Sequence, residues 1–176
     1  MMKVLVCEGR SDAIVLRTVF AAADLNDVRI LEGGGKSSAI SLGTSIALNG
    51  GARVAILVDA DTTDPSRLEE QQLIFDDLLG RSPDNGSCRL FLAVPTLEDA
   101  VFPTAADFAS AFGVKLTPRQ VERYKEDWNL VIRSFLTTPA ANARTMIATK
   151  AAAPQSVRTV FEKPLMGNIK AFFEGE

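Results

Sequence analysis

The sequence predicts an α/β fold: a Rossmann-like, mostly parallel four-stranded sheet flanked by helices, with a helical C-terminal extension. Over the first hundred residues, short apolar runs alternate with segments of helical length and spacing, which is typical of a parallel sheet covered on both faces. After Pro103 the strand-like runs stop. We therefore expect an α/β core over residues 1–103 and a helical part over residues 104–176 that packs on this core.

Four apolar runs predict the strands. The first is expected at residues 3–9, where it closes on Gly9, and the second at 27–35, where it ends in a glycine loop. The third, at 52–61, contains five consecutive apolar residues before its first acid, and the fourth is expected at 88–95. Runs of this length bounded by turn residues are typical of buried strands.

Helical spacing predicts the connections between the strands. Residues 12–23 are expected to form a helix with Ser11 as its N-cap, and residues 36–48 a second helix. Residues 65–80 have a proline at the start, a glycine at the end and apolar residues at helical spacing, so a third helix is expected there. In the C-terminal part, five helices are expected between prolines and glycines, at 105–113, 117–136, 139–152, 156–163 and 167–175.

Composition limits the chemistry. The chain of 176 residues is 47% hydrophobic and 23% charged, as in an ordinary globular protein, and no apolar stretch approaches the roughly 20 residues of a membrane span. Because there is no histidine, serine–histidine or cysteine–histidine nucleophile pairs and histidine-ligated zinc are excluded. Any catalysis must use carboxylates, lysine, arginine, hydroxyls or a hard metal ion. Cys7 and Cys88 lie in strand-like runs and are interpreted as reduced core residues, which fits a cytoplasmic protein.

Acidic residues follow three of the four predicted strands. Glu8 and Asp12 follow the first strand, Asp59 and Asp61 end the third, and Glu98 follows the fourth. Because the carboxyl ends of parallel strands meet at one edge of the sheet, we expect these carboxylates to gather there. Asp59 and Asp61 would share a face if the strand continues through both.

A cation is expected to offset the repulsion among these carboxylates. Oxygen ligands without histidine or thiolate favour Mg²⁺, or Mn²⁺, over zinc. The sequence therefore predicts a magnesium site at the carboxyl edge. Asp64 precedes Pro65 and is either a helix cap or a further ligand.

Two segments together resemble the Toprim domain, which is shared by topoisomerases, bacterial primases, small ribonucleases and OLD-type nucleases. They are "VLVCEGRSDAIVL" and "VAILVDADTTD", with "GGGK" between them, and the resemblance covers roughly residues 3 to 103. The chain is also similar to short stand-alone Toprim proteins of unassigned function. No ATPase, primase or topoisomerase domain accompanies the motif, and Tyr124, the only tyrosine, is expected to be a packing residue.

The resemblance implies roles for individual residues. Glu8 would be a metal ligand or a general acid/base at the scissile phosphate, and Asp59 and Asp61 the metal-binding pair. Asp12 would join a second metal site. A hydroxyl and an acid after the fourth strand would correspond to Thr96 and Glu98. OLD-type enzymes also use a downstream lysine, for which the candidates are Lys150 and Lys163.

The glycine loop has two interpretations. Gly33, Gly34, Gly35 and Lys36 do not form a P-loop, because Ile30 occupies the position of the required earlier glycine. The glycines would still offer backbone N–H groups to a phosphate at the start of a helix, with Lys36 beside them. The alternative is a tight strand-to-helix turn without a ligand.

The sequence thus favours a Mg²⁺-dependent nuclease of the Toprim type that cuts DNA or RNA, acting alone or in a larger complex. The net charge of −3 and the pI near 5.1 oppose strong nucleic-acid binding unless a local basic patch or a protein partner supplies positive charge. The alternative is a non-catalytic Toprim module that docks onto an ATPase or nucleic-acid complex through its helical tail. A phosphoacceptor domain that uses Asp59 is a third and weaker reading.

Overall fold

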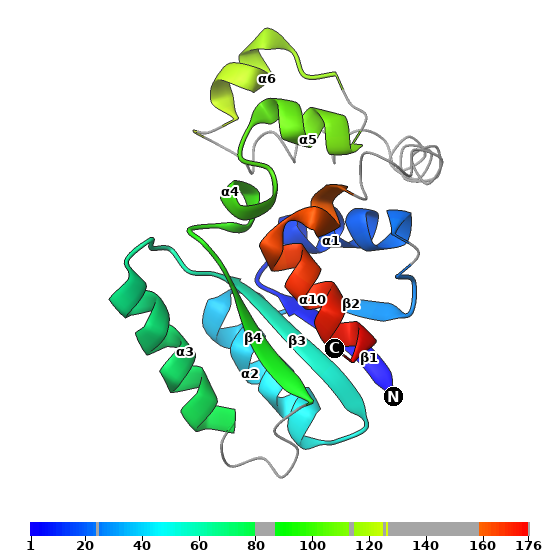
Figure 1. The fold of residues 1–176 in the computed structure, drawn as a ribbon, viewed down its shortest axis with the longest axis vertical. Coiled ribbons are helices and arrows are strands. Elements are labelled where there is room, and N and C mark those ends of the chain that lie inside the picture. The colour runs from blue at the N-terminus through cyan, green and yellow to red at the C-terminus, as the bar shows by residue number, and fades with distance from the viewer. Residues whose placement is uncertain (24, 80–86, 113–114, 125, 127–158, 176) are drawn as a thin grey trace.

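The computed structural model describes residues 1–23, 25–79, 87–112, 115–124, 126 and 159–175 (Figure 1). The helix predicted at 139–152 lies outside these residues, as does most of the helix predicted at 117–136. The predicted division at residue 103 stays a prediction. What the described residues show is the sheet, its covering helices and the elements that hold the site.

Four strands form one all-parallel sheet, in the order β2-β1-β3-β4. The strands are β1 (Met2–Cys7), β2 (Val28–Glu32), β3 (Ala52–Asp59) and β4 (Cys88–Ala93). This confirms the predicted α/β class with a parallel four-stranded sheet flanked by helices. Helical crossovers connect consecutive strands, so all four strands run in the same direction and every strand delivers its carboxyl end to the same edge.

The crossovers are α1 (Arg10–Ala22), α2 (Lys36–Leu48) and α3 (Pro65–Leu79). The N-cap of α1 is Gly9 rather than the predicted Ser11, and the Asp12 carboxylate in the first turn accepts the Gly9 N–H at 2.9 Å. The remaining described helical elements are α4 (Leu97–Val101), α5 (Ala105–Phe112), α6 (Pro118–Arg123), the 3₁₀ helix η1 (Thr159–Glu162) and α10 (Pro164–Glu174). None of the helices described is long and apolar enough to cross a membrane.

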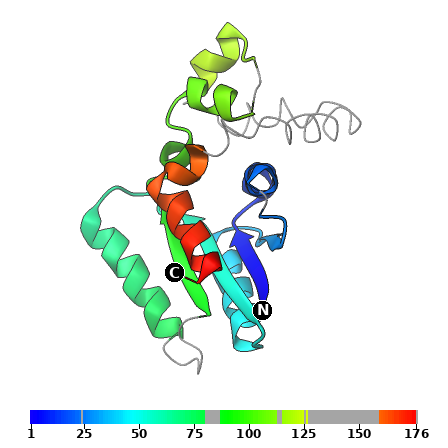
Figure 2. The ribbon, with the colours of Figure 1, turned by 45° about the vertical axis from the view of Figure 1, so that its right-hand side comes forward.

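Alternate residues of the strands build two cores, one on each face of the sheet. Leu5, Ala55 and Phe91 face α1 and α10, whereas Val6, Ile56 and Leu90 face α2 and α3. Figures 1 and 2 show α10 in front of the sheet and α3 standing to one side of it. Burial on both faces explains why the strands are continuous apolar runs rather than alternating ones.

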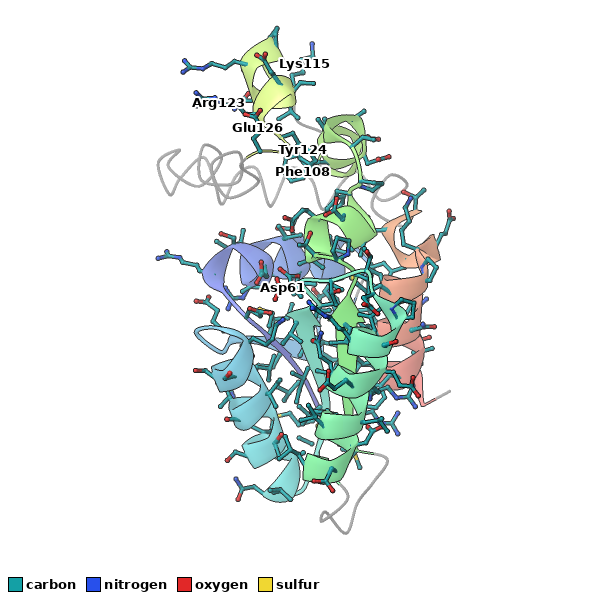
Figure 3. All side chains as sticks on the ribbon, turned by 90° about the vertical axis from the view of Figure 1, so that its left-hand side faces the viewer. Asp61, Phe108, Lys115, Arg123, Tyr124 and Glu126 are labelled. Atoms are coloured by element: carbon teal, nitrogen blue, oxygen red, sulfur yellow. The ribbon has the colours of Figure 1, made fainter. Side chains whose placement is uncertain are left out.

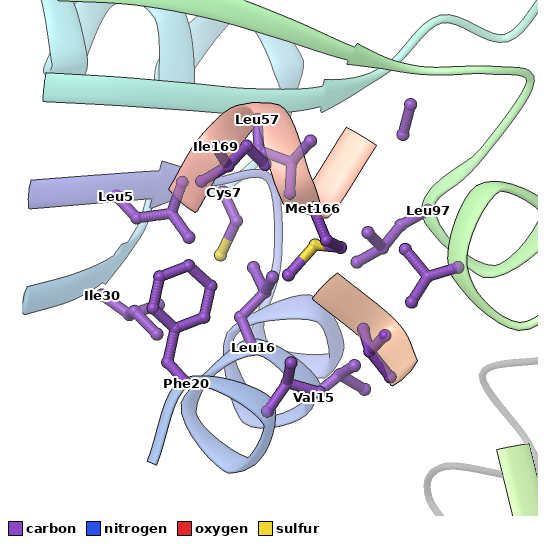
Figure 4. Packing of buried hydrophobic residues seen from close by; sticks show 14 of the residues in the cluster. Leu5, Cys7, Val15, Leu16, Phe20, Ile30, Leu57, Leu97, Met166 and Ile169 are labelled. Carbon is purple, nitrogen blue, oxygen red and sulfur yellow. The ribbon is translucent and has the colours of Figure 1, made fainter. Parts of the chain in front are cut away.

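Helix α10 completes the core on the α1 face. Met166 and Ile169 are fully buried there beside Leu16 of α1 (Figure 4). The Phe172 ring lies near the guanidinium groups of Arg53 and Arg89, 5.6 and 5.4 Å from its centroid, and Arg53 also donates to the Phe172 carbonyl at 2.9 Å. The start of α10 at Pro164, before the predicted residue 167, fits the preference of proline for the first helical turn.

Helices α4, α5 and α6 extend from the carboxyl edge of the sheet (Figure 1). Thr117 caps α6, and its side chain accepts the Gln120 N–H at 3.3 Å. Tyr124 is buried against Phe108, and its hydroxyl donates to the Phe102 carbonyl at 2.9 Å (Figure 3). Tyr124 is therefore a packing residue, and burial raises the pKa of its phenol.

The contact of Gly43 with β3 gives a stability prediction. A Cβ on Gly43 would lie 2.4 Å from Cγ1 of Ile56, a side chain with no solvent exposure. We expect Gly43→Ala to lower the free energy of unfolding by about 1–2 kcal/mol, because the overpacking cost exceeds the roughly 1 kcal/mol by which alanine favours a helix over glycine. Urea denaturation measures this change.

The matched control is Ser45→Ala in the same helix, where the side chain is exposed. Its effect should stay within about 0.5 kcal/mol. A Gly43→Ala protein as stable as the wild type would contradict the close approach of α2 to β3.

Candidate functional site

Glu8 lies just beyond the end of β1 and connects three segments of the carboxyl edge. Its Oε1 accepts the backbone N–H of Asp59 at 2.8 Å, which joins the ends of β1 and β3. Its backbone carbonyl accepts the N–H groups of Gly34 and Gly35 at 2.8 and 2.9 Å. The Glu8 side chain is half-buried, so its carboxylate is held by backbone contacts and is still within reach of solvent.

Asp59, the last residue of β3, is oriented by the start of α4. Its Oδ1 accepts the backbone N–H of Leu97 at 2.8 Å. Thr96, the N-cap of α4, accepts the Asp99 N–H at 3.4 Å, and its hydroxyl donates to the Asp99 carboxylate at 3.1 Å. Thr96 thus fixes the first turn of the helix whose N–H holds Asp59.

Glu8, Asp12 and Glu98 are close enough to Asp59 to act on its charge. Burial raises the pKa of Asp59 to about 7, and repulsion from Glu98, Asp12 and Glu8 adds to this effect, while the hydrogen bond from Leu97 opposes it. The pKa of Asp12 is also raised, chiefly by burial and further by Glu8 and Glu98. Four of the predicted site residues, from three segments of the chain, are therefore close enough for their charges to interact.

Asp61 does not converge with Asp59, which corrects the expectation of a shared strand face. β3 ends at Asp59, and the backbone of Asp61 is left-handed, with φ of 55°. The Asp61 carboxylate forms an ion pair with Lys36 at the start of α2, and its side chain is 67% exposed (Figure 3). Its N–H donates to the Pro95 carbonyl at 2.9 Å, so the turn itself is anchored.

The three glycines do not present free N–H groups to a phosphate, contrary to one of the two expectations. The Gly33 N–H donates to the Cys7 carbonyl, and those of Gly34 and Gly35 donate to Glu8. Gly34 and Gly35 have positive φ values of 83° and 117°, which explains the need for glycine there. The remaining member of the predicted phosphate-binding group is Lys36, whose side chain forms an ion pair with Asp61 at the acidic edge.

Asp64 is a helix cap in this structure. Its Oδ1 accepts the Ser66 N–H at 2.9 Å, one residue beyond Pro65 at the start of α3. Lys150 lies outside the described residues. Lys163 is the N-cap residue of α10, and its side chain is half-buried.

The carboxylates fit a hard cation in their chemistry. Among the residues that the structure describes, no group of three or more acids or thiols is arranged as it stands to hold a metal ion. In each of Glu8, Asp12 and Asp59, however, one oxygen accepts a backbone N–H. Carboxylates oriented in this way are typical of metal ligands with an ordered outer shell.

Sequence reasoning missed two contributors to the site. The backbone N–H of Leu97 holds Asp59, and the pattern Thr96-x-x-Asp99, which is typical of a helix start, could have indicated it. Gln71 of α3 donates from Nε2 to the Ala60 carbonyl at 3.0 Å and so ties α3 to the turn after β3. No sequence signal points to Gln71.

Comparisons with protein-family models, with curated proteins and with solved structures find no match to this chain.

The raised pKa of Asp59 predicts how stability without metal depends on pH. Between the ordinary value of 3.8 and the folded value of about 7, the folded protein binds a proton that the unfolded chain does not, so this residue makes stability fall as pH rises. Above about pH 7 Asp59 is ionised in the folded protein, and its destabilising effect is complete. We expect Asp59→Asn, which can still accept from Leu97, to raise the free energy of unfolding at pH 8 by on the order of 1–2 kcal/mol.

At pH 4 to 5 the gain should shrink, because Asp59 is then protonated and neutral in the folded protein. Urea denaturation at both pH values measures the difference. Asp27→Asn is the control, since Lys3 lowers the pKa of Asp27 and its removal should give no gain at pH 8. An Asp59→Asn variant that is less stable than the wild type at pH 8 would contradict the repulsion.

Proposed function

We propose that this protein is a Mg²⁺-dependent Toprim-type nuclease that cleaves phosphodiester bonds in DNA or RNA. The observation that carries the proposal is the group of Glu8, Asp12, Asp59 and Glu98 at the carboxyl edge of a parallel sheet, where the pKa of Asp59 rises to about 7. This edge is where ligands bind in open α/β sheets. A fold that keeps such repulsion without using it would lose stability for no gain.

Asp12, Asp59 and Glu98 would hold Mg²⁺ or Mn²⁺, with Glu8 as a further ligand or as the group that moves a proton. The metal would polarise the phosphate and lower the pKa of a bound water. Each carboxylate among Glu8, Asp12 and Asp59 already has one oxygen oriented by a backbone N–H, so little reorganisation is needed to direct the other.

Lys36 would supply a positive charge for the phosphate of the substrate. Its ammonium now pairs with the exposed carboxylate of Asp61, and the pair lies beside the acidic edge. A phosphate that displaces Asp61 would gain a positively charged partner and leave the Asp61 carboxylate free as an outer ligand. Exchange of this kind costs little, because exposed ion pairs are worth about 1 kcal/mol or less.

One observation favours the alternative, a non-catalytic or partner-activated module. In the described part of the chain, the acids do not form a ready metal-binding group, and Asp61 is engaged by Lys36. A protein partner or a nucleic-acid complex could supply the rearrangement and the positive charge that a chain of pI near 5.1 lacks.

Calorimetric titration with Mg²⁺ and Mn²⁺ and a cleavage assay on single- and double-stranded DNA and RNA test the proposal. We expect metal binding and metal-dependent cleavage in the wild type. Asp59→Asn should lower the cleavage rate by at least about 100-fold, in the range seen when a positioned charged group is removed from an active site. It should also weaken metal binding at least tenfold.

Asp27→Asn removes one exposed carboxylate paired with Lys3 and serves as the charge-matched control. It should bind metal and cleave as the wild type does. Metal binding without cleavage would favour the partner-dependent module. A wild type that binds neither ion would contradict both the metal site and the nuclease activity.

A further inference from the structure

An open groove lies between α2 and α3 on the face of the sheet opposite α10. Its volume is about 480 Å³, and it is lined by Ile40, Thr44 and Leu48 of α2 and by Leu78 of α3, with serines between them. Figure 3 shows the two helices side by side on this face. Because they belong to separate crossovers and meet chiefly through the sheet, the space between them is open to solvent. We call this the α2–α3 groove.

The rim of the α2–α3 groove exposes large apolar side chains. Leu48 is 55% exposed and Leu78 is 51% exposed. Ile74, one helical turn before Leu78, is 58% exposed. Single exposed apolar residues are ordinary, but several that gather in and beside one groove are typical of a surface that another chain covers.

A polar atom in the groove also lacks a partner. The Oγ1 atom of Thr44 is buried and, among the residues described, has no hydrogen-bond partner. Such an atom costs free energy until something bonds to it. This hydroxyl is enclosed beneath the groove, so it is not itself a contact for a docked chain.

Charge on the two walls distinguishes between the chains that could cover them. From Ser37 to Leu48, α2 carries no charged residue, whereas α3 carries four carboxylates and one guanidinium. Glu70 and Asp77 are exposed beside Ile74 and Leu78, and neither has an ion-pair partner in the described chain. A second copy would bring two acidic α3 helices together, and nucleic acid would meet negative charge. A basic partner is the complementary one.

We propose that the α2–α3 groove binds an amphipathic helix of another protein. Its apolar face covers Ile40, Leu48, Ile74 and Leu78, and its lysines or arginines face Glu70 and Asp77. This is the helix-in-groove mode of recognition, in which apolar anchors recur at helical spacing and rim charges set the choice of partner. The proposal does not depend on the nuclease activity, because the groove and the acidic edge use different residues.

A synthetic peptide of about 18 residues, built of leucine and lysine with leucines at helical i, i+3, i+4 and i+7 positions, is the probe. Its binding to the full chain is followed by fluorescence anisotropy and mapped through backbone amide shifts. We expect saturable binding that shifts the amides of α2 and α3. Ile74→Glu should weaken it at least tenfold, and Glu70→Gln with Asp77→Gln several-fold, with a smaller dependence on salt.

The control Val121→Glu places the same charge on an exposed apolar residue of α6 and should bind as the wild type does. A leucine–glutamate peptide of the same pattern should bind at least tenfold more weakly. Circular dichroism verifies that each variant is folded.

Amide shifts outside α2 and α3, or equal affinity of Ile74→Glu and the wild type, would overturn the proposal. Sedimentation gives an independent test. A wild-type dimer that Ile74→Glu converts to a monomer would identify a second copy as the occupant instead.

Discussion

The hydrogen bond from the Asp59 N–H to the Glu8 carboxylate is the contact on which the carboxyl edge depends. It joins the ends of two neighbouring strands through a side chain, at the point where the ladder between β1 and β3 stops. The carbonyl of the same residue holds the glycine loop that follows β2. Glu8 therefore sets the relative positions of three strand ends, and the other acids are placed with respect to it.

This arrangement has an electrostatic cost that local hydrogen bonds partly offset. Asp12 accepts from Gly9 and Asp59 accepts from Leu97, and both contacts oppose the rise in pKa that burial and neighbouring carboxylates produce. Each of these donors is a backbone N–H at the start of a helix, where such groups otherwise lack partners. The same contacts that stabilise the helices α1 and α4 thus hold the acids at the edge.

The sequence predicted much of the fold and part of the site. Strands and crossovers followed from apolar runs and turn residues, and parallel topology predicted that Glu8, Asp12 and Glu98 lie near enough to Asp59 to act on its charge. The position of Asp61 could not be predicted, because β3 ends at Asp59 and Asp61 itself takes a left-handed backbone conformation. Its pairing with Lys36 depends on tertiary geometry, since the two residues are 25 positions apart.

Sequence patterns could not predict three further details of the structure. Ser11 and Gly9 are both acceptable caps, and the choice depends on where Asp12 points. The glycine loop could bind a phosphate or turn the chain, and only the partners of its N–H groups decide between these roles. The contact of Gln71 with Ala60 joins two segments that no local preference connects.

The position of α10 has a consequence for how the protein is made. The first strand begins at Met2. The same face of the sheet is covered by α10, which carries Met166, Ile169 and Phe172 and is translated last of the described elements. A nascent chain that has not yet released residues 164–174 from the ribosome leaves that face of the sheet uncovered, with Phe91 and Leu57 open to other chains. This face of the sheet is therefore completed only once residues 164–174 are available, and until then its apolar residues are open to aggregation.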